Sequence, residues 1–407
     1  MIGAMEVEKA IQVVVAHPGR QHSHEAALAL DGAGWLAGYW AGIPCLAHHA
    51  RWVPEFLWKR MMRYHFIDLP PARVRWLPWP PLMRKFAMLV PSLHLVGAME
   101  YWGHALFDWW TSRGLYATPN LTAVIAYENS AVRTFKAAKR LGLVTILDAA
   151  SVHHTAQKAE MVYGNAKANL QRTRQQKDME ISLADHIVTA SAMARQSYLS
   201  AGVAPDRVHE VTLGADLKIF GPVLRPRREE TRPFRFLYVG KTNIAKGIDT
   251  LLAAFCLVNG DRAARLEIVG PIGDGHHLVE NEDRDDVKYL PPKLQPDLVA
   301  LYQDADCLIL PSRFDSFGMV VAEALACGLP VIVSDMVGAK SLVVEGENGW
   351  IVQVGNIDVL AQRLRWCIDH RSAMASMREA AARSAQLASW KHYHQRLIST
   401  LSGILKN

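Results

Sequence analysis

Short apolar runs alternate with longer amphipathic stretches along most of this 407-residue chain. In the first half, β-branched runs of strand length lie at 12–16, 122–127, 144–149 and 185–190, and each precedes a stretch with helical spacing. Strands that are apolar on both faces and are separated by helices are typical of a parallel sheet covered by helices on both sides. The pattern therefore predicts an α/β fold.

One polar stretch interrupts the alternation. Residues 221–233, GPVLRPRREETRP, contain three prolines and six charged residues, which is typical of a linker. The strand and helix pattern then restarts at 234 and continues to 335. We predict two doubly wound, Rossmann-like domains, residues 1–220 and 221–389, with the helical segment 390–407 returning to the first. Ligands of such sheets bind beyond the carboxyl ends of the strands, so the cleft between the domains is the expected site.

Composition supports a folded two-domain protein. Hydrophobic residues make up 50% of the chain and charged residues 21%, without a low-complexity tract. The five cysteines are scattered and show no CxxC spacing, which argues against disulfides and metal sites. The start of the chain lacks the layout of a signal peptide, and no apolar run reaches the roughly 18 residues that span a membrane. We expect a cytoplasmic protein.

The net charge of +6 and the pI of 9.0 favour phosphate-bearing ligands or anionic surfaces. Segment 51–85 has eight Arg or Lys against two acids, interleaved with Trp52, Trp58, Trp76 and Trp79. This pairing suits a lipid headgroup boundary, so peripheral contact with the anionic inner face of the cell membrane is one interpretation. Packing of the segment on its own domain is the other. No nucleic-acid motif accompanies the segment, and nucleic acid is not an expected partner.

Two carboxylates stand out in PSRFDSFGMVVAEALACGLPVIVSD, residues 311–335. A strand is expected before the loop and a helix from about Gly318, so the N–H groups of Phe317, Gly318 and Met319 form an anion site suited to a phosphate. Asp315 precedes that site and Glu323 lies inside the helix. Acids there can accept hydrogen bonds from sugar hydroxyls, which fits a nucleotide sugar with Glu323 on the ribose and Asp315 on the transferred sugar. Alternatively, Asp315 caps the helix.

A second candidate segment is LYVGKTNIAKGIDTLLAAF at 237–255. Its strand ends at Gly240, and Lys241 and Lys246 flank the loop that follows. Two ammonium groups at a strand end could neutralise a diphosphate leaving group, although either could be an ordinary surface lysine. The nearby turn at 270–275 contains three glycines and is a weak dinucleotide fingerprint.

Together these segments resemble the retaining glycosyltransferases of family 4, also called glycosyl transferases group 1, which have the GT-B fold of two facing Rossmann-like domains. The resemblance covers about 180–355 and includes EISLADHIVTAS from Glu180, LGAD at 213–216, the VGK and AKG loop, the unit at 307–328 and EGENGWIV at 345–352. It implies a nucleotide-diphosphate sugar donor in the C-terminal domain, retention of anomeric configuration, and no metal or other cofactor.

The resemblance also implies residue roles. Lys241 and Lys246 would contact the diphosphate, Glu323 would bind the ribose, and Asp315 would face the donor sugar. This chain departs from the family pattern at three positions: the family usually has Glu at Asp315, Arg at Lys241 and Glu at Ser341. Asp315 is shorter than the usual Glu, and Lys241 lacks the two parallel donors of an Arg guanidinium, so the donor is harder to identify.

The N-terminal half matches the family more loosely, as expected for the acceptor side. The loop HPGRQHSHEAALAL follows a strand, so Gly19 lets the backbone approach the cleft while Arg20 and His22 line it. The family has a histidine near the donor sugar, and DAASVHHT offers His153, with His154 beside it. The resemblance thus implies Asp315, His153 and Lys246 as catalytic residues, none of them a metal ligand.

The sequence therefore favours a retaining, metal-independent hexosyltransferase that uses a UDP- or GDP-sugar. Its acceptor would be a glycan or a lipid-linked molecule of cell-surface polysaccharide or glycolipid synthesis. Two alternatives stay open. One is a noncatalytic partner protein that keeps the fold and binds nucleotide sugar, and the other is a GT-B enzyme of another type, such as a sugar-nucleotide epimerase.

Overall fold

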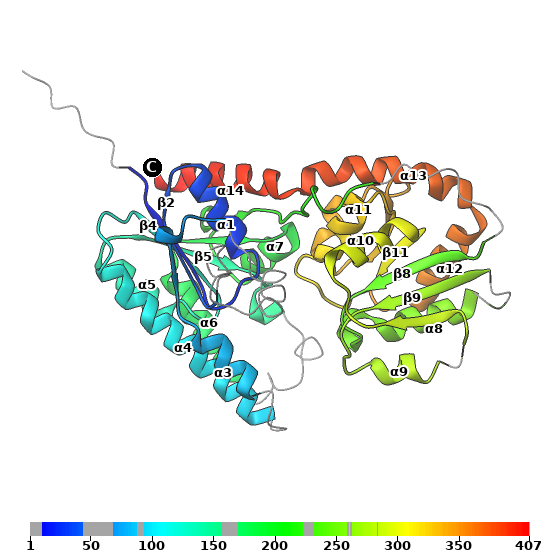
Figure 1. Cartoon of the computed structure of the whole chain (residues 1–407), viewed down its shortest axis with the longest axis horizontal. Coiled ribbons are helices and arrows are strands. Elements are labelled where there is room, and N and C mark those ends of the chain that lie inside the picture. Colours follow the sequence, from blue (N-terminus) through cyan, green and yellow to red (C-terminus); the bar gives the residue numbers. More distant parts are fainter. Residues whose placement is uncertain are drawn as a thin grey trace, which may run out of the picture.

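The computed structural model of the chain describes residues 10–43, 68–87, 93–156, 170–222, 232–258, 260, 263–282 and 284–406. Figure 1 shows two α/β domains side by side, one coloured blue to green and the other green to orange. Each is built on one parallel sheet, as the alternating pattern predicts.

The first domain contains a seven-stranded sheet. Its strands are β1 (Val13–His17), β2 (Leu36–Ala41), β3 (Val74–Trp76), β4 (Ala123–Tyr127), β5 (Val144–Ala149), β6 (His186–Thr189) and β7 (Val208–Glu210), in the order β3-β2-β1-β4-β5-β6-β7. The helices are α1 (Ser23–Gly32), α3 (Trp79–Ala87), α4 (Leu93–Tyr116), α5 (Val132–Arg140), α6 (Leu170–Leu183) and α7 (Ala192–Ser200). All residues of β1 and β4 are buried, because helices cover both faces of the sheet.

The second domain contains a six-stranded sheet. Its strands are β8 (Phe234–Val239), β9 (Ala264–Val269), β10 (Val287–Leu290), β11 (Cys307–Leu310), β12 (Val331–Ser334) and β13 (Gly349–Val352), in the order β10-β9-β8-β11-β12-β13. The helices are α8 (Ile248–Val258), α9 (His276–Glu280), α10 (Gln295–Asp304), α11 (Met319–Ala326), α12 (Ile357–Asp369) and α13 (Arg371–Ser384). In both sheets the strand order reverses beside the first strand, which is where ligands of such sheets bind, at the carboxyl ends of the strands.

The last helix, α14 (Trp390–Leu405), lies against α1 of the first domain (Figure 1). His394 on α14 contacts Glu25 on α1, with Nε2 and Oε2 2.8 Å apart. The chain enters α14 beside the LGAD stretch, where a Cβ on Gly214 would lie 2.2 Å from the carbonyl carbon of Ser389. Only glycine lets the two backbones come so close, which gives this motif residue a packing role.

Several sequence features lie wholly or partly outside the described residues. They are Trp52 and Trp58 with the rest of 51–67, Cys45, most of the expected linker at 223–231, and 157–169 of the expected polar helix. The other four cysteines are free, and Cys256 is exposed. Among the helices that the structure describes, none combines the length and apolar character needed to cross a bilayer.

Candidate functional site

Two loops that follow β8 and β11 pack closely on each other, because these strands are neighbours in the sheet. The first carries Gly240 to Gly247 and the second Arg313 to Gly318. Gly247 has a φ of +74°, and a Cβ there would lie 2.2 Å from the Pro311 carbonyl oxygen, so the position requires glycine. The backbone N–H of Arg313 donates to the Ala245 carbonyl at 2.9 Å. The two loops thus form one bonded edge at the carboxyl ends of β8 and β11.

Lys246 and Asp315 meet at this edge. The Lys246 Nζ lies 2.5 Å from Asp315 Oδ2, with 24% and 19% of the two side chains exposed. The Asp315 backbone is fixed by bonds to Met336 and Gly338 at 3.0 and 2.9 Å. Helix α11 has Gly318 as its N-cap and no side-chain capping bond, so the capping alternative for Asp315 is wrong. Its carboxylate instead pairs with the Lys246 ammonium group.

The start of α11 leaves backbone donors available. Gly318 adopts φ +90°, and a Cβ there would approach Val337 Cγ1 to 2.9 Å. Among the described residues, no acceptor is recorded for the N–H groups of Phe317, Gly318 and Met319. These donors, the positive end of the helix dipole and the nearby Lys246 make this edge suited to an anion.

Glu323 has a partner that sequence reasoning missed. The hydroxyl of the fully buried Tyr302, on α10, donates to Glu323 Oε2 at 2.9 Å. Burial raises the pKa of Glu323, and the bond from Tyr302 lowers it in part. The sequence PDLVALYQDA does not indicate that Tyr302 bonds Glu323, because an aromatic residue in an apolar run is expected to be an ordinary core residue. One carboxylate oxygen is thus committed within the fold, and no hydrogen bond from the described residues is recorded for Oε1.

Lys241 is exposed, and among the described residues its ammonium group has no hydrogen-bond or ion-pair partner. Its loop packs on the glycine-rich turn: a Cβ on Gly270 would lie 2.0 Å from the Gly240 carbonyl oxygen, and one on Gly273 would lie 2.5 Å from that of Thr242. These glycines serve loop packing, which accounts for their spacing without a dinucleotide.

The first domain places a buried polar cluster at the carboxyl ends of β1 and β5. His22 Nε2 lies 2.9 and 3.0 Å from the two carboxylate oxygens of Asp148, the residue before the end of β5. The exposed Gly19 donates its N–H to His17 Nδ1 at 2.7 Å. Burial, followed by repulsion from His22, lowers the pKa of His17 to about 4, so this imidazole is neutral at pH 7.

Sequence reasoning missed Asp148 as a partner of His22, and it missed the residue that covers the pair. Tyr393 of α14 contacts the His22 ring edge-on, with centroids 6.2 Å apart. Among the described residues, neither the buried hydroxyl of Tyr393 nor the buried Nε of Arg20 has a hydrogen-bond partner. The cluster therefore combines an ordered histidine with two buried polar atoms whose hydrogen-bonding capacity is unused among the described residues.

His153 and His154 lie just after β5, with their ring centroids 4.4 Å apart and the ring planes tilted by 31°. His154 Nε2 lies 3.1 Å from Asp178 on α6. Burial, followed by repulsion from His154, lowers the pKa of His153, and burial likewise lowers the pKa of His154. No hydrogen bond or ion pair from either histidine to Lys246 or Asp315 is recorded among the described residues.

One direct bond joins the two halves of the site. The hydroxyl of Ser191, the N-cap of α7, donates to the Ser316 carbonyl at 2.7 Å. A Cβ on Gly338 would lie 2.1 Å from the same carbonyl oxygen and 2.7 Å from Ser191 Oγ. Gly338 thus permits the contact between the domains. Ser341, in the same turn, is exposed and donates only to the Gly338 carbonyl, at 3.4 Å.

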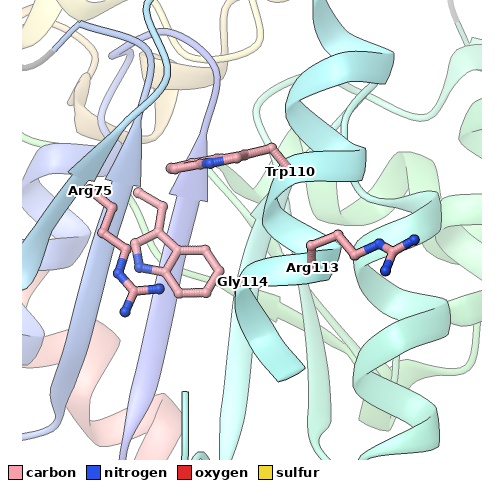
Figure 2. Close-up of a pocket in the computed structure, with 5 residues that line it drawn as sticks. Arg75, Trp110, Arg113 and Gly114 are labelled. Carbon is pink, nitrogen blue, oxygen red and sulfur yellow. The ribbon is translucent and has the colours of Figure 1, made fainter. Parts of the chain in front are cut away.

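A cavity of about 230 Å³ lies elsewhere in the first domain, between β2–β3 and α4 (Figure 2). Its lining residues are Trp40, Arg75, Trp110, Arg113 and Gly114. The Arg75 guanidinium lies over the Trp40 ring, 5.4 Å from its centroid. Figure 2 shows Arg113 pointing away from the Trp110 ring. This cavity contains none of the residues that the sequence singled out as site residues.

The second domain matches a known family. Residues 224–384 match the family model for glycosyl transferases group 1. Similar curated proteins include two D-inositol 3-phosphate glycosyltransferases. The one from Thermomonospora curvata is 32% identical, over 54% of this chain and 57% of the relative. The one from Corynebacterium glutamicum strain R is 31% identical, over 50% of this chain and 53% of the relative. The chain thus spans little more than half the length of these relatives.

Solved structures resemble nearly the whole chain. Anabaena HepE in complex with UDP and glucose has a TM-score of 0.66 at 16% identity, covering 96% of this chain and 99% of that one. Sucrose-phosphate synthase from Thermosynechococcus elongatus has a TM-score of 0.68 at 18% identity, covering 97% and 99%. Likeness at this identity concerns the fold, and the predicted GT-B fold of two Rossmann-like domains is confirmed.

Proposed function

We propose that the protein is a retaining glycosyltransferase that moves a hexose from a UDP- or GDP-sugar to a glycan or lipid-linked acceptor. One observation carries the proposal: the Lys246–Asp315 pair lies beside the free N–H groups of Phe317 to Met319, inside a glycosyl transferases group 1 domain. Cationic and backbone donors can hold a diphosphate there, while the acid faces the sugar. The D-inositol 3-phosphate glycosyltransferases among the relatives and the UDP-glucose complex of HepE support the reaction class and the kind of donor.

The donor would lie across the edge that these loops form. Lys246, Lys241 and the start of α11 would bind the diphosphate, and Oε1 of Glu323 would accept a hydrogen bond from the ribose. Asp315, already bound to Lys246, would accept hydrogen bonds from the sugar with its remaining capacity. One side chain pair would thereby couple the position of the sugar to that of the leaving group.

The proposed reaction is front-side. The acceptor oxygen bonds to the anomeric carbon on the face that the diphosphate leaves, the bond from that carbon to the phosphate oxygen breaks, and the acceptor proton passes to the departing oxygen. Lys246 and the N–H groups of the helix start stabilise the charge that develops there, a contribution of about 10²–10³ in rate for one such donor. These groups supply the positive charge, so the proposal includes no metal or other cofactor. His153 of the first domain would contact the sugar.

The acceptor would bind the first domain. His22 and Asp148 form an ordered pair at the strand ends, with the partly exposed Arg20 in the same loop as His22. Acceptor hydroxyls are the chemical partners that such groups bind. His154, which the sequence also suggested for the acceptor side, contacts Asp178 instead.

A lipid-linked acceptor fits one surface of this domain. Large aromatic side chains are exposed on β3, α3 and α4: Trp76 48%, Trp79 58%, Phe86 64%, Trp102 58% and Trp109 43%. The exposed Arg75, Lys85 and Arg113 accompany them. We propose peripheral contact with anionic lipid at the inner face of the cell membrane through this surface, because half-buried rings and cations suit headgroups. Figure 1 shows α3 and α4 side by side along the lower edge of the first domain.

The test begins with the purified chain and a thermal-shift screen of UDP-, GDP- and ADP-sugars, since a ligand of the folded state raises the melting temperature. The stabilising donor is then tested for slow release of free nucleotide. Lys246→Ala should reduce this release by at least about tenfold, and Lys288→Ala, which removes an exposed lysine from the edge strand β10, should not. Equal loss in both variants would contradict the assigned diphosphate site.

A noncatalytic partner protein is the second candidate, and Asp315 and Ser341 in place of the family's glutamates favour it. Such a protein would bind a nucleotide sugar without releasing nucleotide, even with acceptor present. An epimerase would convert the donor to an isomer and release no glycan product. Chromatography of sugar, nucleotide and glycan products from one incubation separates the three activities.

A further inference from the structure

We propose that the cavity between β2–β3 and α4 binds the phosphate headgroup of an anionic phospholipid. The inference rests on the proposed contact of the first domain with anionic lipid, and it adds a defined site to that surface. The residues that line the cavity are separate from those of the proposed sugar transfer.

The cavity offers hydrogen-bond donors and no side-chain acceptor. Its lining consists of two tryptophans, two arginines and a glycine: Trp40, Arg75, Trp110, Arg113 and Gly114. A guanidinium group and an indole N–H can only donate, so the ligand must supply the acceptors and the negative charge. A neutral sugar hydroxyl also donates, and no lining side chain can accept its proton. A phosphate ester matches this set of donors.

The Arg75 guanidinium is available to such a ligand. Arg75 is exposed, and no hydrogen bond or ion pair is recorded for it among the described residues. Its guanidinium lies over the Trp40 ring, 5.4 Å from the centroid, a contact that orients the group and leaves its charge in place. Figure 2 shows Trp110 extending from its helix toward the strand that carries Arg75.

Two glycines fix the Trp40 ring that forms one wall of the cavity. A Cβ on Gly114 of α4 would lie 2.7 Å from Trp40 Cζ3, and one on Gly38 of β2 would lie 2.7 Å from Trp40 Nε1. The ring can lie this close to both backbones only because neither position has a side chain. This wall is therefore ordered before a ligand binds, which lowers the entropic cost of binding.

The surroundings favour a lipid over a soluble phosphate ester. Trp102 and Trp109 share one face of α4 and are 58% and 43% exposed. Arg113 follows Trp109 by one helical turn, so the lining of the cavity continues into this aromatic face. Exposed indole rings beside cations suit the region just below a lipid headgroup. At about 230 Å³ the cavity is smaller than the roughly 300–1,000 Å³ of sites that enclose a whole small molecule, so a headgroup can enter while its chains stay outside.

Binding of a monomeric short-chain lipid to the full-length chain, without nucleotide or acceptor, tests the cavity directly. The probe is dihexanoylphosphatidylglycerol below its micelle concentration, and calorimetric titration measures its affinity. Arg75→Gln should bind the probe at least about tenfold more weakly than the wild type, because a hydrogen bond between two charged groups is lost. Since Arg75 is exposed, this variant should fold, and its melting temperature verifies that.

The matched control is Lys85→Gln, which removes an exposed cation from α3 outside the cavity. It should leave the affinity for the monomeric lipid unchanged and lower only the sedimentation with phosphatidylglycerol vesicles. Equal affinity in the wild type and Arg75→Gln would overturn the proposal, as would an equal loss in both variants.

Two further ligands identify the source of the phosphate. Glycerol phosphate, which lacks the chains, and zwitterionic dihexanoylphosphatidylcholine should each bind at least about tenfold more weakly than the probe. Glycerol phosphate that binds as tightly as the probe would assign the cavity to soluble phosphate esters and overturn the lipid. Sedimentation with vesicles but no binding of the monomer would reject the cavity and leave the proposed membrane contact standing.

Discussion

The bond between Tyr302 and Glu323 provides a sharp test of the donor site. Replacing Tyr302 by Phe removes only the hydroxyl that donates to Glu323 Oε2 at 2.9 Å. The carboxylate is mostly buried, so the lost bond to a charged group costs about 1.5–3 kcal/mol of folding stability. If Glu323 also binds ribose, a loss of about 1.4 kcal/mol in that contact weakens nucleotide binding about tenfold.

The pH dependence has a definite sign. Burial raises the pKa of Glu323 above that of the unfolded chain, and the bond from Tyr302 partly opposes this rise. Tyr302→Phe should raise the pKa further. The stability loss should be greatest at high pH, where an ionised carboxylate has lost its donor, and should shrink as pH falls through the folded-state pKa. Nucleotide affinity should fall with acidification, and in the variant this fall should begin at a higher pH.

Denaturant unfolding and titration with the free nucleoside diphosphate, each at several pH values, measure both effects. Tyr198→Phe is the control, because its buried hydroxyl also donates to a carboxylate, that of Glu128 at 3.3 Å, but in the first domain. It should lose stability and keep nucleotide affinity. A Tyr302→Phe protein that is destabilised yet binds nucleotide with unchanged affinity and pH dependence would refute the ribose assignment.

Three further predictions concern other parts of the molecule. Burial raises the pKa of Glu180 from 4.5 to about 7, so the free energy of unfolding should fall by roughly 3 kcal/mol as pH rises through that window. In urea melts Glu180→Gln should flatten this pH dependence, and the same dependence in the variant and the wild type would contradict the prediction. Gly338→Ala should cost about 1–3 kcal/mol because its Cβ would meet the Ser316 carbonyl oxygen at 2.1 Å, and an unchanged melting temperature would show that the domain contact is loose. Trp102→Ala should leave stability unchanged and reduce sedimentation with anionic liposomes, which itself should fall with salt; salt-insensitive or absent sedimentation would contradict membrane contact.

The fold could be predicted from the sequence because its signals are local. The buried strands of the two sheets are apolar runs, and a helix commonly follows a strand after a short loop, as α8 follows β8. The loop that contains Lys246 and the loop that contains Asp315 follow neighbouring strands of one sheet. A doubly wound topology therefore brings them together without further information.

The partners within the site could not be predicted, because they come from distant segments. His22 and Asp148 are 126 residues apart, and Tyr393 reaches the same cluster from the last helix. Tyr302 looked like an ordinary core residue, although its hydroxyl satisfies Glu323. The glycine-rich turn at 270–275 has a pattern that is typical of ligand binding, but in this structure its glycines allow two loops to pack closely. Local spacing does not distinguish the two uses of glycine.

The most direct measurement is a crystal structure of the chain with the stabilising nucleotide sugar bound. We predict that the diphosphate contacts Lys246 and the N–H groups of residues 317–319, and that the ribose hydroxyls contact Glu323. A ligand bound away from residues 240–247 and 315–323, for example in the cavity beside Trp40, would contradict the account.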